Sequence, residues 1–158
     1  MTVLAIHLVL TLAWVAITGS THAGNVLLGF GATYAVLWWV RPVLGPTRYF
    51  EKLPAGLVLA AVFAWELVKS NFRVAYDVIT PKANRRPGIV AVPLDAKAEF
   101  EIMLLANLVT LTPGTLSLDV STDRSVLYVH AMFIDEDEEE VRRSIKQRFE
   151  RRVIALLR

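Results

Sequence analysis

The sequence predicts an α-helical membrane hairpin and a long amphipathic third helix, followed by a small α+β domain. Two observations lead to this fold class. Residues 1–40 contain no Asp, Glu, Lys or Arg, whereas every such charge lies at or after Arg41. After Gly114, apolar and polar residues alternate with the period of a half-buried strand. We therefore divide the chain into a hairpin over 1–41, a connector with the third helix over 42–80, and an α+β domain over 81–158.

The hairpin consists of two apolar runs, 3–17 and 26–40, joined by the small polar linker 18–25. A bilayer offers the backbone no water to bond, so runs of this kind form helices that satisfy their own peptide groups. No Lys or Arg precedes Arg41, and the first run therefore lacks the basic start of a signal peptide. We expect it to be retained.

Residues at the end of the second run predict how the hairpin is oriented. Trp38 and Trp39 stand where an interfacial aromatic belt is expected, and the basic residues Arg41, Arg48 and Lys52 follow them. Cytoplasmic loops are enriched in Lys and Arg, so this end should face the cytoplasm. Both ends of the hairpin then lie on the cytoplasmic side of a multi-pass cell-membrane protein.

The third helix is predicted from about Ala55 to Ile79. Its first part is apolar, and its second part carries charges every three or four residues along one face, namely Glu66, Lys69, Arg73 and Asp77. Basic residues flank both ends, so a full span would place one basic end outside the cell. We favour a helix that enters the membrane obliquely or lies at the cytoplasmic interface. A full third span is the alternative.

The remaining residues predict a βαββα order. The expected elements are strands over 89–94, 115–121 and 126–134, a helix over 96–110, and a last helix that starts at Asp135 or Asp137 and reaches about Leu157. Pro113 and Gly114 end the first of these helices, and Pro93 implies an edge strand or a strand end. This order suggests a split βαβ, ferredoxin-like sandwich that lacks its last strand and has both helices on one face.

Several classes of chemistry are excluded by the sequence. There is no Cys, so disulfides and thiolate metal sites are impossible. His7, His22 and His130 are too far apart for metal-ligand spacing, and the acidic run 135–140 lacks the glycine and alternating ligands of a calcium loop. No nucleophile elbow, P-loop or dinucleotide fingerprint is present, so we expect no cofactor. A net charge of +2 is too small to indicate nucleic-acid binding.

Ionisable residues near the membrane are the remaining candidates. His7 lies inside the first apolar run, which suggests a proton relay, but the hairpin offers no carboxylate partner. A neutral histidine bonded to a neighbouring helix is the favoured interpretation. Glu66 and Lys69 would line an ion path if the third helix spans, and would otherwise form a charged cytoplasmic or interfacial face. Arg85 and Arg86 are expected beside anionic lipid headgroups.

Three strings carry a family resemblance: ANLVTLTPGTLSLDV, then LYVHAMFID, then RFERRV in the last helix. In this order they resemble the E subunit of the Mrp (Mnh, Pha) multisubunit monovalent cation/proton antiporters. The resemblance implies a non-catalytic structural or assembly subunit of a sodium/proton antiporter in the cell membrane. Its partners would be membrane lipid and the other subunits, with sodium and protons handled by the complex rather than by this chain.

The same resemblance gives the hairpin surface a function. Subunit contacts are expected along the exposed face of the third helix and at the small and aromatic hairpin positions Gly24, Gly29, Gly31, Trp38 and Trp39. The family supplies no catalytic residues that can be transferred to this sequence. From the residues alone, a stand-alone binding or scaffold module anchored in the membrane is the alternative function.

Overall fold

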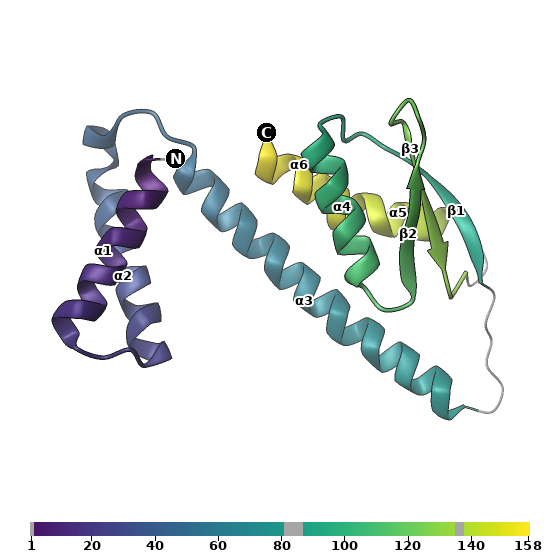
Figure 1. The fold of residues 1–158 in the computed structure, drawn as a ribbon, viewed down its shortest axis with the longest axis horizontal. Coiled ribbons are helices and arrows are strands. Elements are labelled where there is room, and N and C mark those ends of the chain that lie inside the picture. Colours follow the sequence, from purple (N-terminus) through teal and green to yellow (C-terminus); the bar gives the residue numbers. More distant parts are fainter. Residues whose placement is uncertain (1, 81–86, 135–137) are drawn as a thin grey trace. The chain divides into compact units, whose positions relative to one another are not determined.

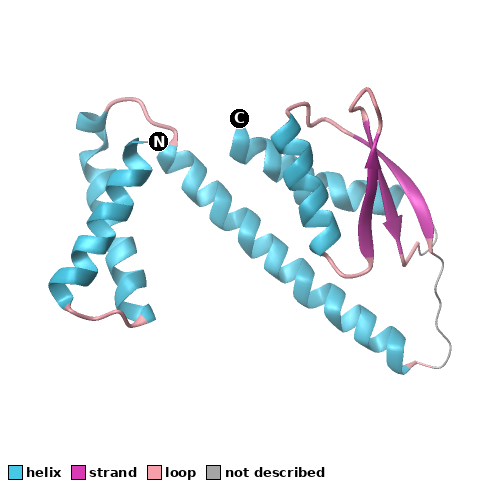
Figure 2. Cartoon of the chain, viewed as in Figure 1, coloured by secondary structure: helices cyan, strands magenta, loops and turns pink. Residues whose placement is uncertain are grey.

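The computed structural model describes residues 2–80, 87–134 and 138–158 (Figure 1). Its elements are α1 (Thr2–Thr18), α2 (Ala23–Leu44), α3 (Tyr49–Ile79), β1 (Gly88–Pro93), α4 (Glu99–Leu111), β2 (Thr115–Val120), β3 (Val126–Ala131), α5 (Glu138–Ile145), the π-helical turn η1 (Lys146–Glu150) and α6 (Arg151–Leu157). Helices dominate the first half, and the strands lie between α3 and α5 (Figure 2). The chain forms two compact units, Met1–Leu53 and Pro54–Arg158.

The first unit contains the predicted hairpin, in which α1 packs against α2. Gly19 follows α1 with a φ of 63°, a left-handed conformation that glycine adopts without steric cost. Asn25 then ties the turn together, because its side-chain amide donates to the hydroxyl of Thr18 and to the carbonyl of Ser20, both at 2.7 Å. Of these helices, α2 is long and apolar enough to cross a membrane, as α3 is, whereas α1 is shorter.

The connector between the second and third helices is much shorter than predicted. α2 continues through Pro42, and Gly45, with a φ of 76°, follows its last residue. α3 begins at Tyr49 instead of Ala55 and contains Pro54. The predicted helix ends were wrong here because a proline near a helix terminus removes only one backbone donor. Helices in apolar surroundings tolerate this loss, so proline was a poor marker of their limits.

The second unit is built on a three-stranded sheet in the order β1-β3-β2. β3 pairs antiparallel with both neighbours, so β1 and β2 point the same way on either side of it. Pro93 ends β1, which is an edge strand, as its missing N–H predicts. Alternate residues of β1 and β3 face α4, η1 and α6, and this core includes Val90, Val92, Leu127 and Val129. The helices therefore cover one face of the sheet (Figure 1).

β2 presents its leucines to the opposite, uncovered face. Its alternating pattern would ordinarily bury the leucines, yet Leu116 and Leu118 are 45% and 47% exposed. Ser117 points inward instead, where its hydroxyl donates to the carbonyl of Ala106 in α4 at 2.9 Å. The alternation predicted a strand correctly but does not show which face of it is covered.

The last helix is continuous from Glu138 to Leu157 and includes a π-helical turn. Val141, Ile145, Phe149 and Val153 form an apolar stripe at four-residue spacing, and the last three of them are buried in the core. Val141, the first member of the stripe, is partly buried against that core. The predicted caps at 135 and 137, like the basic pair at 85 and 86, lie outside the described residues.

The two faces of the sheet domain predict different costs for the same substitution. Leu105→Ala should destabilise the second unit by about 2–5 kcal/mol, because Leu105 is fully buried in the core. Leu118→Ala should cost less than about 1 kcal/mol, since this side chain is about half exposed. Hydrogen exchange of the β3 amides in the full-length chain measures both effects. Equal losses of protection would contradict the assignment of the two faces.

Candidate functional site

Buried polar side chains are the first candidates for functional residues in this chain. They are His7, Thr11, Glu66, Asp77, Glu101, Thr112 and Glu150. Within residues 2–80, 87–134 and 138–158, no group of three His, Cys, Asp or Glu residues is arranged to hold a metal ion. In the same ranges every buried side-chain nitrogen and oxygen has a hydrogen-bond partner. These groups are therefore bonded within the chain.

His7 joins the two helices of the hairpin. Its Nε2 lies 2.9 Å from the carbonyl oxygen of Phe30 in α2, and a carbonyl only accepts, so Nε2 carries the proton. Nδ1 hydrogen-bonds to the hydroxyl of Tyr49. Beside it, Thr11 donates to the His7 carbonyl and lies 3.1 Å from the hydroxyl of Thr33. The structure therefore places His7 in a hydrogen bond to the neighbouring helix α2.

The three candidate glycines have different surroundings. A Cβ atom at Gly29 would lie 2.4 Å from a ring carbon of Trp14, so this glycine permits close approach of α1 and α2. At Gly24 a Cβ would meet the ring of His22 at 3.3 Å. Around Gly31, by contrast, nothing lies within 4 Å of the added atom.

The two candidate tryptophans lie on the surface of the same unit. Trp39 is 81% exposed and Trp38 is half exposed. The guanidinium of Arg41 stands 4.8 Å from the centre of the Trp38 ring, a cation–π distance. Gly31 and the two tryptophans are therefore exposed, whereas Gly29 is used inside the hairpin.

Glu66 lies on the inner face of α3, where it pairs with the domain. Its carboxylate is 2.6 Å from the guanidinium of Arg148 in η1, and the residue is only 9% exposed. Earlier in the same helix, Leu59 enters the core of the second unit. Lys69, the other candidate on α3, is exposed one turn further on. The charged face predicted from sequence is thus turned toward the α+β domain.

The opposite face of α3 is apolar and exposed. It carries Trp65, Val68, Phe72, Tyr76, Val78 and Ile79, which are between 49% and 77% exposed. A helix with one face on a charged domain and the other face uncovered and apolar is typical of segments that meet lipid or another protein.

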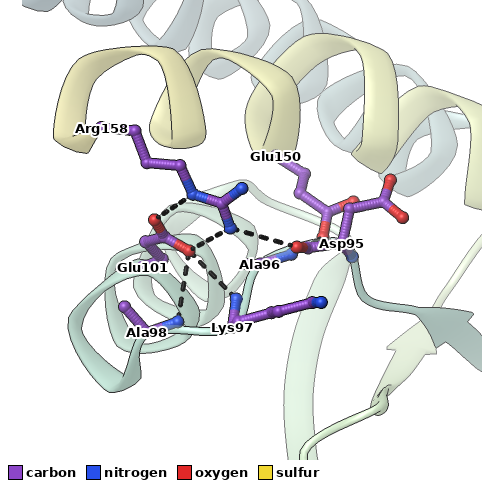
Figure 3. Close-up of polar contacts among 7 residues, drawn as sticks. All are labelled: Asp95, Ala96, Lys97, Ala98, Glu101, Glu150 and Arg158. Atoms are coloured by element: carbon purple, nitrogen blue, oxygen red, sulfur yellow. Dashed lines mark hydrogen bonds and ion pairs between the residues drawn. The ribbon is translucent and has the colours of Figure 1, made fainter.

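Two buried glutamates, Glu101 and Glu150, hold the start of α4 and the loop before it against the last helix (Figure 3). Glu101 is 3% exposed, and its carboxylate accepts from the backbone N–H groups of Lys97 and Ala98 at 3.0 and 3.2 Å. Arg158 at the end of the chain donates to the same carboxylate from Nε at 3.0 Å and from Nη2 at 3.2 Å. The hydrogen bond from Arg158 and those from the backbone lower the pKa of Glu101 to about 2.

Glu150 holds the loop after β1 against the last helix. It is 1% exposed, and its carboxylate accepts from the backbone N–H groups of Asp95 and Ala96 at 2.6 and 3.0 Å. Lys146 bridges the pair, with its ammonium 2.6 Å from Asp95 and 3.3 Å from Glu150. Sequence reasoning missed both buried glutamates. Only the position of Glu101 in the first turn of a helix hinted at a cap.

A family model described as Na+/H+ ion antiporter subunit matches residues 7–156. The E subunit of the Na+/H+ antiporter of Alkalihalophilus pseudofirmus is 37% identical over 149 residues, which are 94% of each chain. The E1 subunit of the Na+/H+ antiporter of Staphylococcus haemolyticus is 38% identical over 136 residues, 86% of each chain. A chain of the membrane-bound sulfane sulfur reductase, an archaeal respiratory membrane complex, shares the fold with a TM-score of 0.61, covering 98% of both chains at 24% identity.

Long apolar helices and a small α+β domain together define the class as a membrane protein that carries a small α+β domain. The family model and the curated relatives make the assignment specific. The chain belongs to the family of Na+/H+ antiporter E subunits. The resemblance seen in the TPGT and YVH strings is confirmed.

Gly29 and Gly31 allow a controlled test of the hairpin contact. Gly29→Ala should destabilise the hairpin by about 1–3 kcal/mol, because the new methyl group overlaps the Trp14 ring. Gly31→Ala should leave the stability of the hairpin unchanged or slightly raised, because no atom lies near the added methyl group. Both substitutions raise helix propensity equally, so the difference between them reports the contact with Trp14. Thermal unfolding of the detergent-solubilised chain compares the two. A similar response from both variants would argue against the close approach.

Glu101 should make the domain sensitive to acid. A carboxyl with a lowered folded-state pKa contributes stability above its unfolded pKa of about 4.5, and this is lost as pH falls toward about 2. Glu101→Gln should lower stability by about 2 kcal/mol at pH 7 and flatten the pH dependence between these values. Glu99→Gln, an exposed carboxyl in the same helix turn, is the matched control. Thermal unfolding midpoints of the two variants, measured from pH 7 to pH 2.5, test this prediction. Identical plots of midpoint against pH for the two variants would refute the stabilising role assigned to the Glu101 carboxylate.

Proposed function

We propose that this chain is a non-catalytic subunit of a multisubunit sodium/proton antiporter in the cell membrane, where it holds neighbouring subunits in place. The observation that carries the proposal is the match to antiporter E subunits over nearly the whole chain. The chemistry of the chain supports it. His7 and Glu66, the ionisable groups best placed for an ion path, are both bonded within the chain. Other subunits would then carry sodium and protons.

The hairpin would cross the membrane twice, with the α+β domain in the cytoplasm. Basic residues Arg41, Arg48 and Lys52 around the α2–α3 junction support a cytoplasmic position for that junction. The domain would be a split βαβ, ferredoxin-like sandwich without its last strand. The order β1-β3-β2 and the placement of the helices on one face support this classification.

In this proposal α3 lies at the cytoplasmic membrane surface and does not span the bilayer. Its inner face contacts the α+β domain over several turns, from Leu59 in the core to Glu66 at Arg148. A full span would carry these contacts, and the charged residues that make them, into hydrocarbon at a cost of several kcal/mol per ion. An interfacial helix instead buries its apolar outer face while the domain stays in water.

The surfaces proposed for contact with other subunits are those left uncovered. They are the hairpin around Gly31, Trp38 and Trp39, and the part of the apolar face of α3 that lipid does not cover. Exposed aromatic residues of this size are enriched where proteins associate.

Deletion of the chain tests the assembly function. Without it, the remaining antiporter subunits should fail to co-purify as one complex, and cells should lose sodium-resistant growth. The intact gene supplied in trans should restore both. An intact complex and normal sodium resistance in the deletion strain would favour a stand-alone membrane-anchored module instead.

The absence of native cysteine makes the topology testable by single substitutions. Ser20→Cys, between α1 and α2, should react with a membrane-impermeant thiol reagent in intact cells. Ser125→Cys, in the turn before β3, should react only after the cells are lysed, since the domain would be cytoplasmic. Labelling of position 125 from outside would show that α3 spans the membrane or that the orientation is inverted.

A further inference from the structure

A cleft of about 350 Å³ opens in the second unit between α3, the turn after α4, and the α5–η1 segment. Its charged lining consists of Lys69, Arg73, Arg143 and Arg148 with the carboxylates of Glu66 and Glu140. Among the residues that the structure describes, four cations against two carboxylates give the lining an excess of positive charge. Hydroxyl groups of Ser70 and Ser144 add neutral donors.

The excess charge can be assigned to particular side chains. Arg148 and Glu66 neutralise each other at 2.6 Å. Arg73 places its guanidinium 4.6 Å from the centre of the Phe133 ring. Within the described parts of the chain, neither Lys69 nor Arg143 has a carboxylate within ion-pair distance, and both are exposed. Counting only residues 2–80, 87–134 and 138–158, the cleft therefore presents an ammonium and a guanidinium whose charges are not compensated by an ion pair.

The same helix that lines the cleft also carries the exposed apolar face. Lys69 and Arg73 are on the polar side of α3, whereas Val68, Phe72 and Tyr76 are exposed outside the cleft. A helix that lies in the membrane interface buries its apolar face near the boundary between headgroups and acyl chains. Its polar face, and the cleft beside it, then lie at the level of the headgroups.

We propose that this cleft binds the phosphate of an anionic phospholipid headgroup, with Lys69 and Arg143 as its principal ligands. A guanidinium and an ammonium are the side chains that proteins use for phosphate, the first through its planar fork and the second as a point charge. Free phosphate has the same chemistry. The lipid is favoured because the helix that provides Lys69 also offers acyl chains an apolar face. The proposal rests on the interfacial position proposed above for α3.

The experiment measures binding of short-chain phosphatidylglycerol to the full-length chain in zwitterionic detergent. Lys69→Gln with Arg143→Gln should weaken binding about 25-fold, because each cation near an anionic membrane contributes about fivefold. Arg124→Gln removes one charge from the β2–β3 turn, outside the cleft, and should leave binding unchanged. Arg143→Lys keeps the charge and should retain most of the affinity. Circular dichroism of each variant checks that the fold is intact.

Three results would overturn the proposal. Equal affinity of the double variant and the native chain would exclude the cleft. Equal binding of short-chain phosphatidylcholine would exclude recognition of anionic charge. Displacement of the lipid by an equal concentration of inorganic phosphate would identify a free-anion site. Assembly of the antiporter is measured separately. If the double variant loses lipid binding but the complex still assembles, the proposed assembly function is unaffected. If lipid binds normally but the complex does not depend on this chain, the proposed lipid site is unaffected.

Discussion

The pairing of Glu66 with Arg148 is the interaction on which the organisation of the second unit depends. A buried carboxylate is tolerable only when a partner replaces the water it has lost, so α3 must turn its charged side toward the domain. Once that side is occupied, the apolar residues of α3 can only point outward. One ion pair thus links the position of the domain on α3 to the surface that this helix offers to lipid or to other subunits.

The polar groups of the hairpin are likewise hydrogen-bonded inside the molecule, where they link its two helices. His7, Thr11 and Thr33 would each be costly in hydrocarbon if left unbonded, and each is bonded to a neighbour or to the backbone. Gly29 allows the two helices to approach closely enough for those bonds to form. The first unit therefore presents a mainly apolar surface and keeps these polar atoms inside.

Hydrophobic periodicity predicted nearly every helix and strand, because burial of apolar residues depends on spacing that is visible in the sequence. Element limits at Pro42 and Pro54 were wrong, since a membrane-type helix tolerates a lost donor near its end. The buried glutamates could not be predicted. Glu101 meets Arg158, which lies 57 residues away, and nothing local marks a pairing of that separation. Glu66 and Lys69 were recognised as a charged face, but what that face contacts is decided by the tertiary fold.

The π-helical turn at Lys146–Glu150 has a consequence for how this helix can vary. Apolar residues spaced four apart drift around a regular α-helix by about 40° per step. The wider turn absorbs that drift, so Ile145, Phe149 and Val153 remain in one core. Deletion of one residue within the turn would let it relax to ordinary α-helix while the C-terminal segment keeps nearly the same orientation. Arg158 would then stay on the side of the helix that faces Glu101, so this turn is the place where the last helix can lose a residue without breaking that ion pair.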